Sequence, residues 1–149
     1  HASAQTSTCA VAYHDACHLA HARGVREAPR RLLGELPGVE LVPLAESDRC
    51  CGSAGIYNLL QPQTAGALLA EKLERLEASG AAVATAANPG CLLHLAAGLA
   101  AKGSGMEVRH PLELLDEACN QACSRALSAA QRAASETSPA PANPANPGP

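Results

Sequence analysis

Four short apolar runs, each followed by a segment of helical pattern, constrain the fold of this chain more than any other feature. Short apolar runs with β-branched or aromatic residues, bounded by turn residues, are typical of strands. They occupy residues 9–14, 39–44, 81–86 and 106–110. Strands that alternate with helices form parallel sheets, because each helix returns the chain to the edge where the next strand begins. The sequence therefore predicts an α/β fold, with a parallel sheet of about four strands and flanking helices.

Proline and glycine mark the ends of the predicted helices. Pro62 opens the clearest helix and Gly80 ends it, with apolar residues at helical spacing between them. Further helices are predicted near residues 28–38, from Cys91 onward and from Pro111 onward. The predicted domain covers residues 1–130. Residues 131–149 are dominated by Ser, Pro, Ala and Asn, a composition that predicts a disordered tail.

Composition argues against two classes of partner. Aromatic residues make up 1% of the 149 residues and the net charge is −3, so stacking platforms and a basic surface are both lacking. Nucleic-acid binding is therefore not expected. No apolar run approaches the roughly 18 residues of a membrane span, and no signal-peptide pattern is present. We expect a cytoplasmic protein, and we interpret the chain, which lacks an initiator Met, as a C-terminal fragment of a longer subunit.

Four cysteines lie in segments that directly follow predicted strands. Cys17 follows the first strand, Cys50 and Cys51 follow the second, and Cys91 follows the third. The carboxyl ends of parallel strands lie at one edge of a sheet, so these four thiols are expected to converge there. A disulfide between the two adjacent cysteines would be strained, because consecutive Cα atoms lie about 3.8 Å apart, below the usual span of about 4.4–6.8 Å. The pair is therefore expected to serve another purpose.

Four converging thiolates can bind either a zinc ion or a [4Fe–4S] cluster. Structural zinc sites usually use cysteine pairs spaced two to four residues apart, and these four cysteines contain no such pair. We therefore favour a [4Fe–4S] cluster, with zinc and metal-free redox thiols as the alternatives. Gly52 and Gly55 are expected to let backbone N–H groups approach the cluster closely.

The histidines are expected to have lesser roles. His14, His18 and His21 have helical spacing, but the segment is predicted to be a loop, so direct metal ligation by these residues is not favoured. We place His18 in the environment of the cluster because it follows Cys17. His110 is placed there as well, because it ends the fourth predicted strand at the same edge.

The remaining cysteines are interpreted as structural. Cys119 and Cys123 share a helical stripe with Leu112 and Leu115, which is typical of small buried apolar residues. Cys9 precedes the first strand and is interpreted as incidental. No serine has the context of a catalytic triad and no pair of carboxylates suggests acid–base catalysis, so no catalytic residue is assigned.

Three strings of residues make the sequence similar to a known family. "YHDACHLAHARGVR", "ESDRCCGSAGIYNLLQP" and "ANPGCLLHLAAGL" resemble the C-terminal part of the glycolate oxidase iron–sulfur subunit. This subunit contains the cysteine-rich CCG domain, which also occurs in heterodisulfide reductase and in lactate-utilisation subunits. The similarity runs from about Tyr13 to Asp116 and is specific, because several long strings agree in order.

The resemblance implies a subunit that transfers electrons and is not itself the site of substrate oxidation. In that family, flavin-containing subunits oxidise glycolate, and the iron–sulfur subunit passes the electrons toward the quinone pool. This implies a cytoplasmic location, with peripheral association at the inner face of the plasma membrane. The cluster ligands of the family correspond to Cys17, Cys50, Cys51 and Cys91. The alternatives are a heterodisulfide reductase-like thiol enzyme, a subunit of a lactate-oxidising complex, and a docking module without a cluster.

The sequence also departs from the family pattern. The broader CCG pattern ends in C-x-x-C, and Asn88 occupies the first of those two positions. This favours ligation by four cysteines over a five-cysteine cluster, and it places Asn88 in the cluster environment. The ferredoxin-like cysteine runs and the first CCG repeat of the family are not found in these 149 residues.

Overall fold

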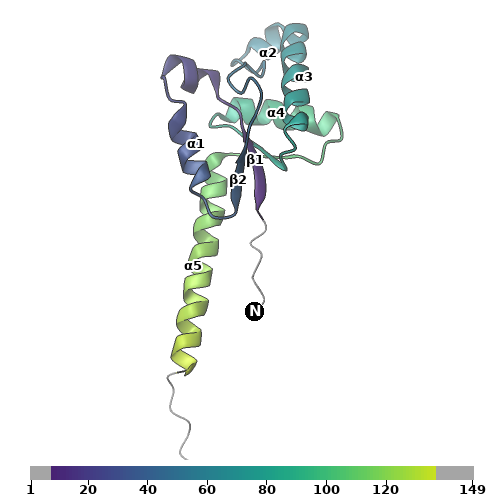
Figure 1. The fold of residues 1–149 in the computed structure, drawn as a ribbon. Coiled ribbons are helices and arrows are strands. Elements are labelled where there is room, and N and C mark those ends of the chain that lie inside the picture. Colours follow the sequence, from purple (N-terminus) through teal and green to yellow (C-terminus); the bar gives the residue numbers. More distant parts are fainter. Residues whose placement is uncertain (1–7, 137–149) are drawn as a thin grey trace, which may run out of the picture. The chain divides into compact units, whose positions relative to one another are not determined.

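A computed structural model describes residues 8–136 of the chain. Its elements alternate between strand and helix (Figure 1). In chain order they are β1 (Cys9–Tyr13), the π-helix η1 (His18–Ala22), α1 (Glu27–Gly34), β2 (Val39–Val42), α2 (Tyr57–Leu60), α3 (Pro62–Ala78), β3 (Val83–Thr85), α4 (Pro89–Ala101), β4 (Glu107–Arg109) and α5 (Pro111–Glu136).

The four strands form one parallel sheet in the order β2-β1-β3-β4. Strand β1 lies in the middle of this order, where Val11 pairs with Leu41 of β2 on one side and with Val83 of β3 on the other. Strand β4 pairs with β3 and forms one edge of the sheet. The predicted α/β fold with a parallel four-stranded sheet is confirmed.

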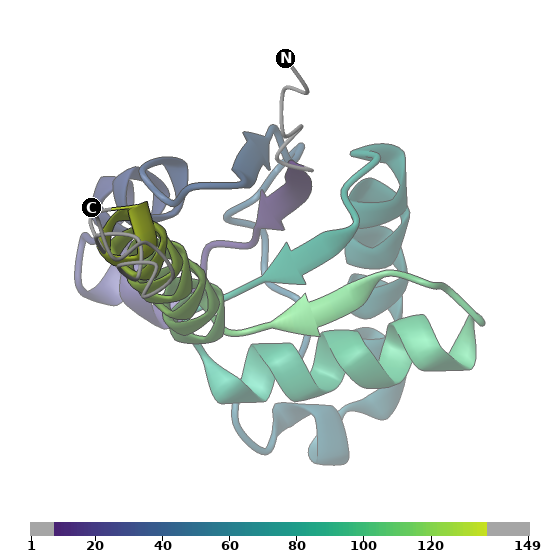
Figure 2. The same cartoon turned by 90° about the horizontal axis from the view of Figure 1, so that it is seen from below.

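Alternating residues of the central strands face two separate cores. Ala12 and Ala84 pack with leucines of α3 and α4, whereas Val11, Tyr13 and Val83 pack with α1 and with the first turns of α5. Figure 2 shows α3 and α4 on one side of the sheet and α1 on the other. Strands that are buried on both faces are expected in a parallel sheet. Both sheet faces are covered, so the loops at the strand ends are the remaining place for a functional site.

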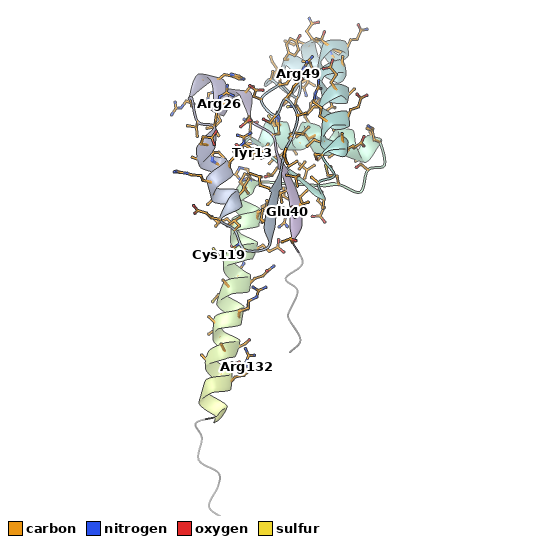
Figure 3. All side chains as sticks on the ribbon, viewed as in Figure 1. Tyr13, Arg26, Glu40, Arg49, Cys119 and Arg132 are labelled. Atoms are coloured by element: carbon orange, nitrogen blue, oxygen red, sulfur yellow. The ribbon has the colours of Figure 1, made fainter. Side chains whose placement is uncertain are left out.

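The chain divides into two compact units after Ala118, and helix α5 contributes residues to both. In the first unit, Leu114 and Ala118 of this helix are buried. The second unit, taken by itself, is a helix with exposed residues from Cys119 to Arg132 (both labelled in Figure 3). The helix continues to Glu136, so residues 131–136 of the predicted tail are helical. The rest of that prediction, residues 137–149, lies outside the described residues.

The prediction that Cys119 and Cys123 are buried is wrong, because both are exposed. The physical reason is that every residue from Cys119 to Arg132 is exposed, so this part of the helix has no buried side. In the first unit the buried side of α5 is formed by Leu114 and Ala118, and Leu112, which we placed on the buried stripe, is 60% exposed.

Two short helical segments were not predicted. The segment after β1 forms a π-helix, in which the N–H of Arg23 donates to the carbonyl of His18 at 3.2 Å. Helix α2 occupies Tyr57–Leu60. The predicted helix near residues 28–38 ends earlier than expected, at Gly34, and Gly38 adopts a φ of 80° in the turn before β2. Within residues 8–136, no helix is both long enough and apolar enough to cross a membrane.

Candidate metal centre

The four predicted cysteines lie in the three segments that directly follow β1, β2 and β3. The chain leaves β1 toward β2 on one side and leaves β3 toward β4 on the other, so the strand order reverses between β1 and β3. In open parallel sheets, ligand sites form at the carboxyl ends of the strands at such a reversal. Cys17 precedes η1 after β1, and Cys91 lies in the first turn of α4 after β3. The topology therefore accounts for how cysteines far apart in sequence meet.

Cys51 and Cys91 form the buried part of the site together with His14. Their two Sγ atoms and a ring nitrogen of His14 all lie within 4.8 Å of one another. His14 is fully buried, Cys51 is 1% exposed and Cys91 is 6% exposed. Two thiols and an imidazole at this separation are donors of the types that bind transition metals.

Cys17 and Cys50 form a second, half-buried pair beside the first. The Cys17 thiol is close enough to Cys50 to help raise the pKa of Cys50, and both interact electrostatically with Cys91. Cys17 and Cys91 also line one pocket of about 370 Å³. The rest of its lining is Ala16, His18, Ser53, Ala54, Gly55, Asn88 and Gly90. Cys17 and Cys50 thus lie next to the buried pair, at the same edge of the sheet.

The pKa values of the two buried thiols are shifted in opposite directions. A hydrogen bond from Cys91, together with the neighbouring His14 and the N–H of Ser53, holds the pKa of Cys51 well below its usual range. The same hydrogen bond, added to burial and to the nearby thiols, raises the pKa of Cys91. Burial also raises the pKa of Cys50. The arrangement thus favours one thiolate, at Cys51, next to thiols that a bound cation would help to deprotonate.

The turn that carries the adjacent cysteines directs backbone N–H groups at their sulfur atoms. The N–H of Gly52 donates to Sγ of Cys50 at 3.3 Å, and the N–H of Ser53 bonds to Cys51. Gly52 adopts a φ of 89°, and a Cβ atom on it would lie 2.4 Å from the carbonyl oxygen of Ala65. Gly55 also has a left-handed φ, 64°, but a Cβ atom there would contact nothing. Of these two glycines, Gly52 is therefore the one at which a side chain would clash with neighbouring backbone.

Asn88 positions Cys91 as the cap of helix α4. Its Oδ1 accepts a hydrogen bond from the backbone N–H of Cys91 at 3.1 Å. Gly90 fits beside it, since a Cβ atom there would lie 3.1 Å from both Asn88 Oδ1 and the hydroxyl of Ser53. Asn88 thus lines the pocket and orients the helix turn that carries a thiol.

Replacing Asn88 by alanine should lower the free energy of unfolding by about 1 kcal/mol, because the cap of α4 is lost. Urea denaturation of the metal-free chain measures this. Asn88→Ser is the matched control, since serine caps helices nearly as well, and it should stay within a few tenths of a kcal/mol of the natural chain. An equal loss in both variants would contradict the capping role.

A buried polar network supports the loop that leads to the adjacent cysteines. The carbonyl of Ser47 accepts hydrogen bonds from His14 Nδ1 at 3.0 Å, from the N–H of Asp15 at 3.0 Å and from Lys72 Nζ at 3.4 Å. Lys72 Nζ also donates to the carbonyl of Glu46 at 2.6 Å. These contacts tie the loop after β2 to β1 and to α3.

Two charged groups in this network were not assigned a role from the sequence. Asp15 pairs with Arg30 through two contacts of 2.6 Å, and Ser47 donates its hydroxyl hydrogen to the same carboxylate at 2.8 Å. Burial would raise the pKa of Asp15, but these hydrogen bonds outweigh it and lower the pKa. Lys72 is fully buried, and burial lowers its pKa. Its position seven residues after the buried Ala65 and four before the buried Leu76, on the same face of α3, was a signal that sequence reasoning missed.

The burial of the histidines differs from the prediction. His18 lines the pocket but is exposed, whereas His14, whose ligation was not favoured, is the buried one beside the thiols. His110 Nδ1 accepts from the N–H of Leu112 at the start of α5, and His110 is not part of the pocket lining. A signal for His14 was present in its position, because it directly follows a buried strand, as ligands at a sheet edge do.

The fold and the four thiols at one edge of its parallel sheet are those of a cysteine-rich α/β domain. The sequence profile of the CCG cysteine-rich domain matches residues 11–96, and the chain belongs to this family. The matched range contains His14 and all four converging cysteines.

Individual relatives are similar over about 70% of the chain. The probable glycolate oxidase iron–sulfur subunit of Bacillus subtilis is 38% identical over 110 residues, which are 72% of this chain and 25% of that protein. Lactate utilization protein A of an Exiguobacterium species is 34% identical over 73% of this chain and 44% of that protein. The same-named protein of Geobacillus kaustophilus is 35% identical over 70% of this chain and 44% of that protein. The chain thus spans less than half the length of each of these relatives.

Proposed function

We propose that this chain is the cluster-binding, electron-transfer part of an iron–sulfur subunit in a glycolate-oxidising complex. The observation that carries the proposal is the convergence of four thiols, in two interacting pairs, at one edge of the sheet. The donor set fits a [4Fe–4S] cluster, since the thiols come from three separate loops and a cubane is wider than a single ion. Cys17, Cys50, Cys51 and Cys91 would hold this cluster, which supplies one-electron transfer when bound.

The surroundings of the thiols also suit an anionic cluster. Gly52 and Ser53 direct N–H groups at the sulfur atoms, which stabilises negative charge there. The Lys72 ammonium interacts favourably with Cys51, and this offsets part of the charge that four thiolates bring. Burial of Cys51 and Cys91 keeps water from that side of the site. Hydrogen bonds and solvent exposure of this kind set the potential of iron–sulfur clusters.

The partners we propose are flavin-containing subunits that oxidise glycolate, with electrons passing onward to quinone. The support is the 38% identity to the glycolate oxidase iron–sulfur subunit. We place the complex in the cytoplasm, at the inner face of the membrane that holds the quinone. The second candidate is a lactate-oxidising complex, which is favoured by the 34% identity to lactate utilization protein A. A thiol–disulfide enzyme of the heterodisulfide reductase kind remains the alternative chemistry for the adjacent cysteines.

Anaerobic reconstitution of the full chain with iron and sulfide tests the proposal. We expect about four iron and four sulfide per chain, visible absorption that bleaches on reduction, and an electron paramagnetic resonance signal in the reduced state. Binding of zinc in place of iron, or a chain that takes up no metal, would contradict the proposal. A signal that changes only when a disulfide substrate is added would instead favour the thiol–disulfide enzyme.

A further inference from the structure

We propose that Nε2 of His14 is a ligand of the metal centre, on the side formed by Cys51 and Cys91. The proposal rests on the proposed function, because it takes the centre to be an iron–sulfur cluster. It adds a nitrogen donor to the four thiolates, so the centre would have both sulfur and nitrogen ligands.

The hydrogen bond of the other ring nitrogen determines which tautomer His14 adopts. Nδ1 lies 3.0 Å from the carbonyl oxygen of Ser47, and a carbonyl oxygen can only accept. Nδ1 must therefore carry the hydrogen, and in a neutral imidazole Nε2 then carries a free lone pair. Metal-binding histidines commonly donate their other N–H to a backbone carbonyl in this way, which fixes the ring for ligation.

Nε2 is fully buried and has no nitrogen or oxygen partner among the described residues, and the polar group that interacts with the ring is the Cys51 thiol. A buried polar atom without a partner costs about 1–3 kcal/mol, so such atoms call for a specific explanation. The two buried thiols beside His14 supply one, because a metal held by Cys51 and Cys91 would be within reach of the ring nitrogen. Ligation would remove the cost of the unpartnered nitrogen.

The backbone holds His14 in place before any metal arrives. Its N–H donates to the carbonyl of Thr85 at 2.8 Å, which extends the pairing of β1 with β3 by one residue. The neighbouring histidines lack this arrangement. His18 is exposed, and His21 is exposed with its ring nitrogens near Asp48 and Arg26.

The expected centre has five protein donors, one more than the four irons of a cubane. One of the irons would therefore have to accept two protein donors, and Cys51, Cys91 and His14 are the residues that would share that side of the centre. An imidazole is neutral where a thiolate is anionic, so His14 would add a donor without adding negative charge to the centre. A nitrogen bound to iron also has a signature of its own, since its nuclear spin couples to the electron spin of the reduced cluster.

Pulsed electron paramagnetic resonance of the reconstituted full chain tests this directly. With natural histidine we expect a strong ¹⁴N coupling, and labelling of histidine alone with ¹⁵N should replace it by a ¹⁵N coupling. The coupling should disappear in His14→Leu, because this substitution removes the nitrogen and puts an apolar side chain of similar size in its place. His18→Ala is the matched control and should retain it, because His18 lines the same pocket but is exposed.

The outcomes separate the two proposals. A reduced cluster without a histidine coupling in the labelled natural chain would overturn the role of His14 and leave the proposed function intact. A chain that forms no cluster at all would overturn both. If His14→Leu does not fold, the isotope exchange in the natural chain still decides the question, because it requires no substitution.

Discussion

Replacing Cys51 by serine should abolish iron–sulfur cluster formation in the reconstituted chain. Cys51 interacts with Cys91, His14 and the N–H of Ser53, so it is tied to both other buried donors of the site. A serine hydroxyl is a harder and far less acidic donor than a thiol. The loss should exceed the roughly 10- to 100-fold fall in metal affinity that follows removal of an outer partner. Iron content and visible absorption after reconstitution measure it.

Cys119→Ser is the matched control for this prediction. It makes the same chemical change at an exposed position on α5, and iron content should equal that of the natural chain. Thermal unfolding of both metal-free variants shows whether Cys51→Ser still folds, so that loss of iron is attributable to the missing thiolate. Full cluster content in folded Cys51→Ser would remove Cys51 from the proposed ligands.

Replacing Gly52 by alanine should give the largest loss of stability of any single methyl addition in this site. A left-handed φ costs a residue with a Cβ atom about 1–2 kcal/mol, and overpacking costs about 1–3 kcal/mol more. Here the added atom would lie 2.4 Å from the carbonyl oxygen of Ala65, which is backbone and cannot rotate away. We therefore expect a loss of about 2–5 kcal/mol in the free energy of unfolding, measured by urea denaturation of the metal-free chain.

Gly103→Ala separates the cost of the left-handed backbone from the cost of overpacking. Gly103 has a φ of 69°, but a Cβ atom there would have no heavy atom within 4 Å. This variant should lose only the cost of the left-handed backbone, about 1–2 kcal/mol. If the two variants lost equal amounts, the close approach to Ala65 would not be the reason for glycine at position 52.

The fold could be predicted from the sequence because its signals are local. Pro62 and Pro111 mark helix starts, and the four apolar runs mark strands that the structure contains at those places. The convergence of the thiols followed from topology alone, since parallel strands end at one edge. These predictions required no knowledge of which side chains touch.

What could not be predicted depends on contacts between distant segments. The π-helix after β1 places His18 toward solvent while His14 stays buried, and a loop prediction cannot rank the two histidines. Lys72 is buried because the carbonyls of Glu46 and Ser47 accept its hydrogens, a partnership across α3 and the loop after β2. Likewise the buried side of α5 depends on how Leu114 meets the sheet, which the spacing of apolar residues alone did not determine.

The four thiols lie in three segments that are far apart in the sequence. Their arrangement affects whether folding or metal binding comes first. In a zinc finger, neighbouring cysteines can capture a metal from the unfolded chain, and metal binding then drives folding. Here Cys17 and Cys91 meet only after β1 has paired with β3, a contact between segments far apart in sequence. Such pairing forms slowly, because the loop entropy is lost before the contact is gained. We therefore expect the polypeptide to fold before it receives a metal, and a late-acting cluster donor would have to recognise the folded sheet edge.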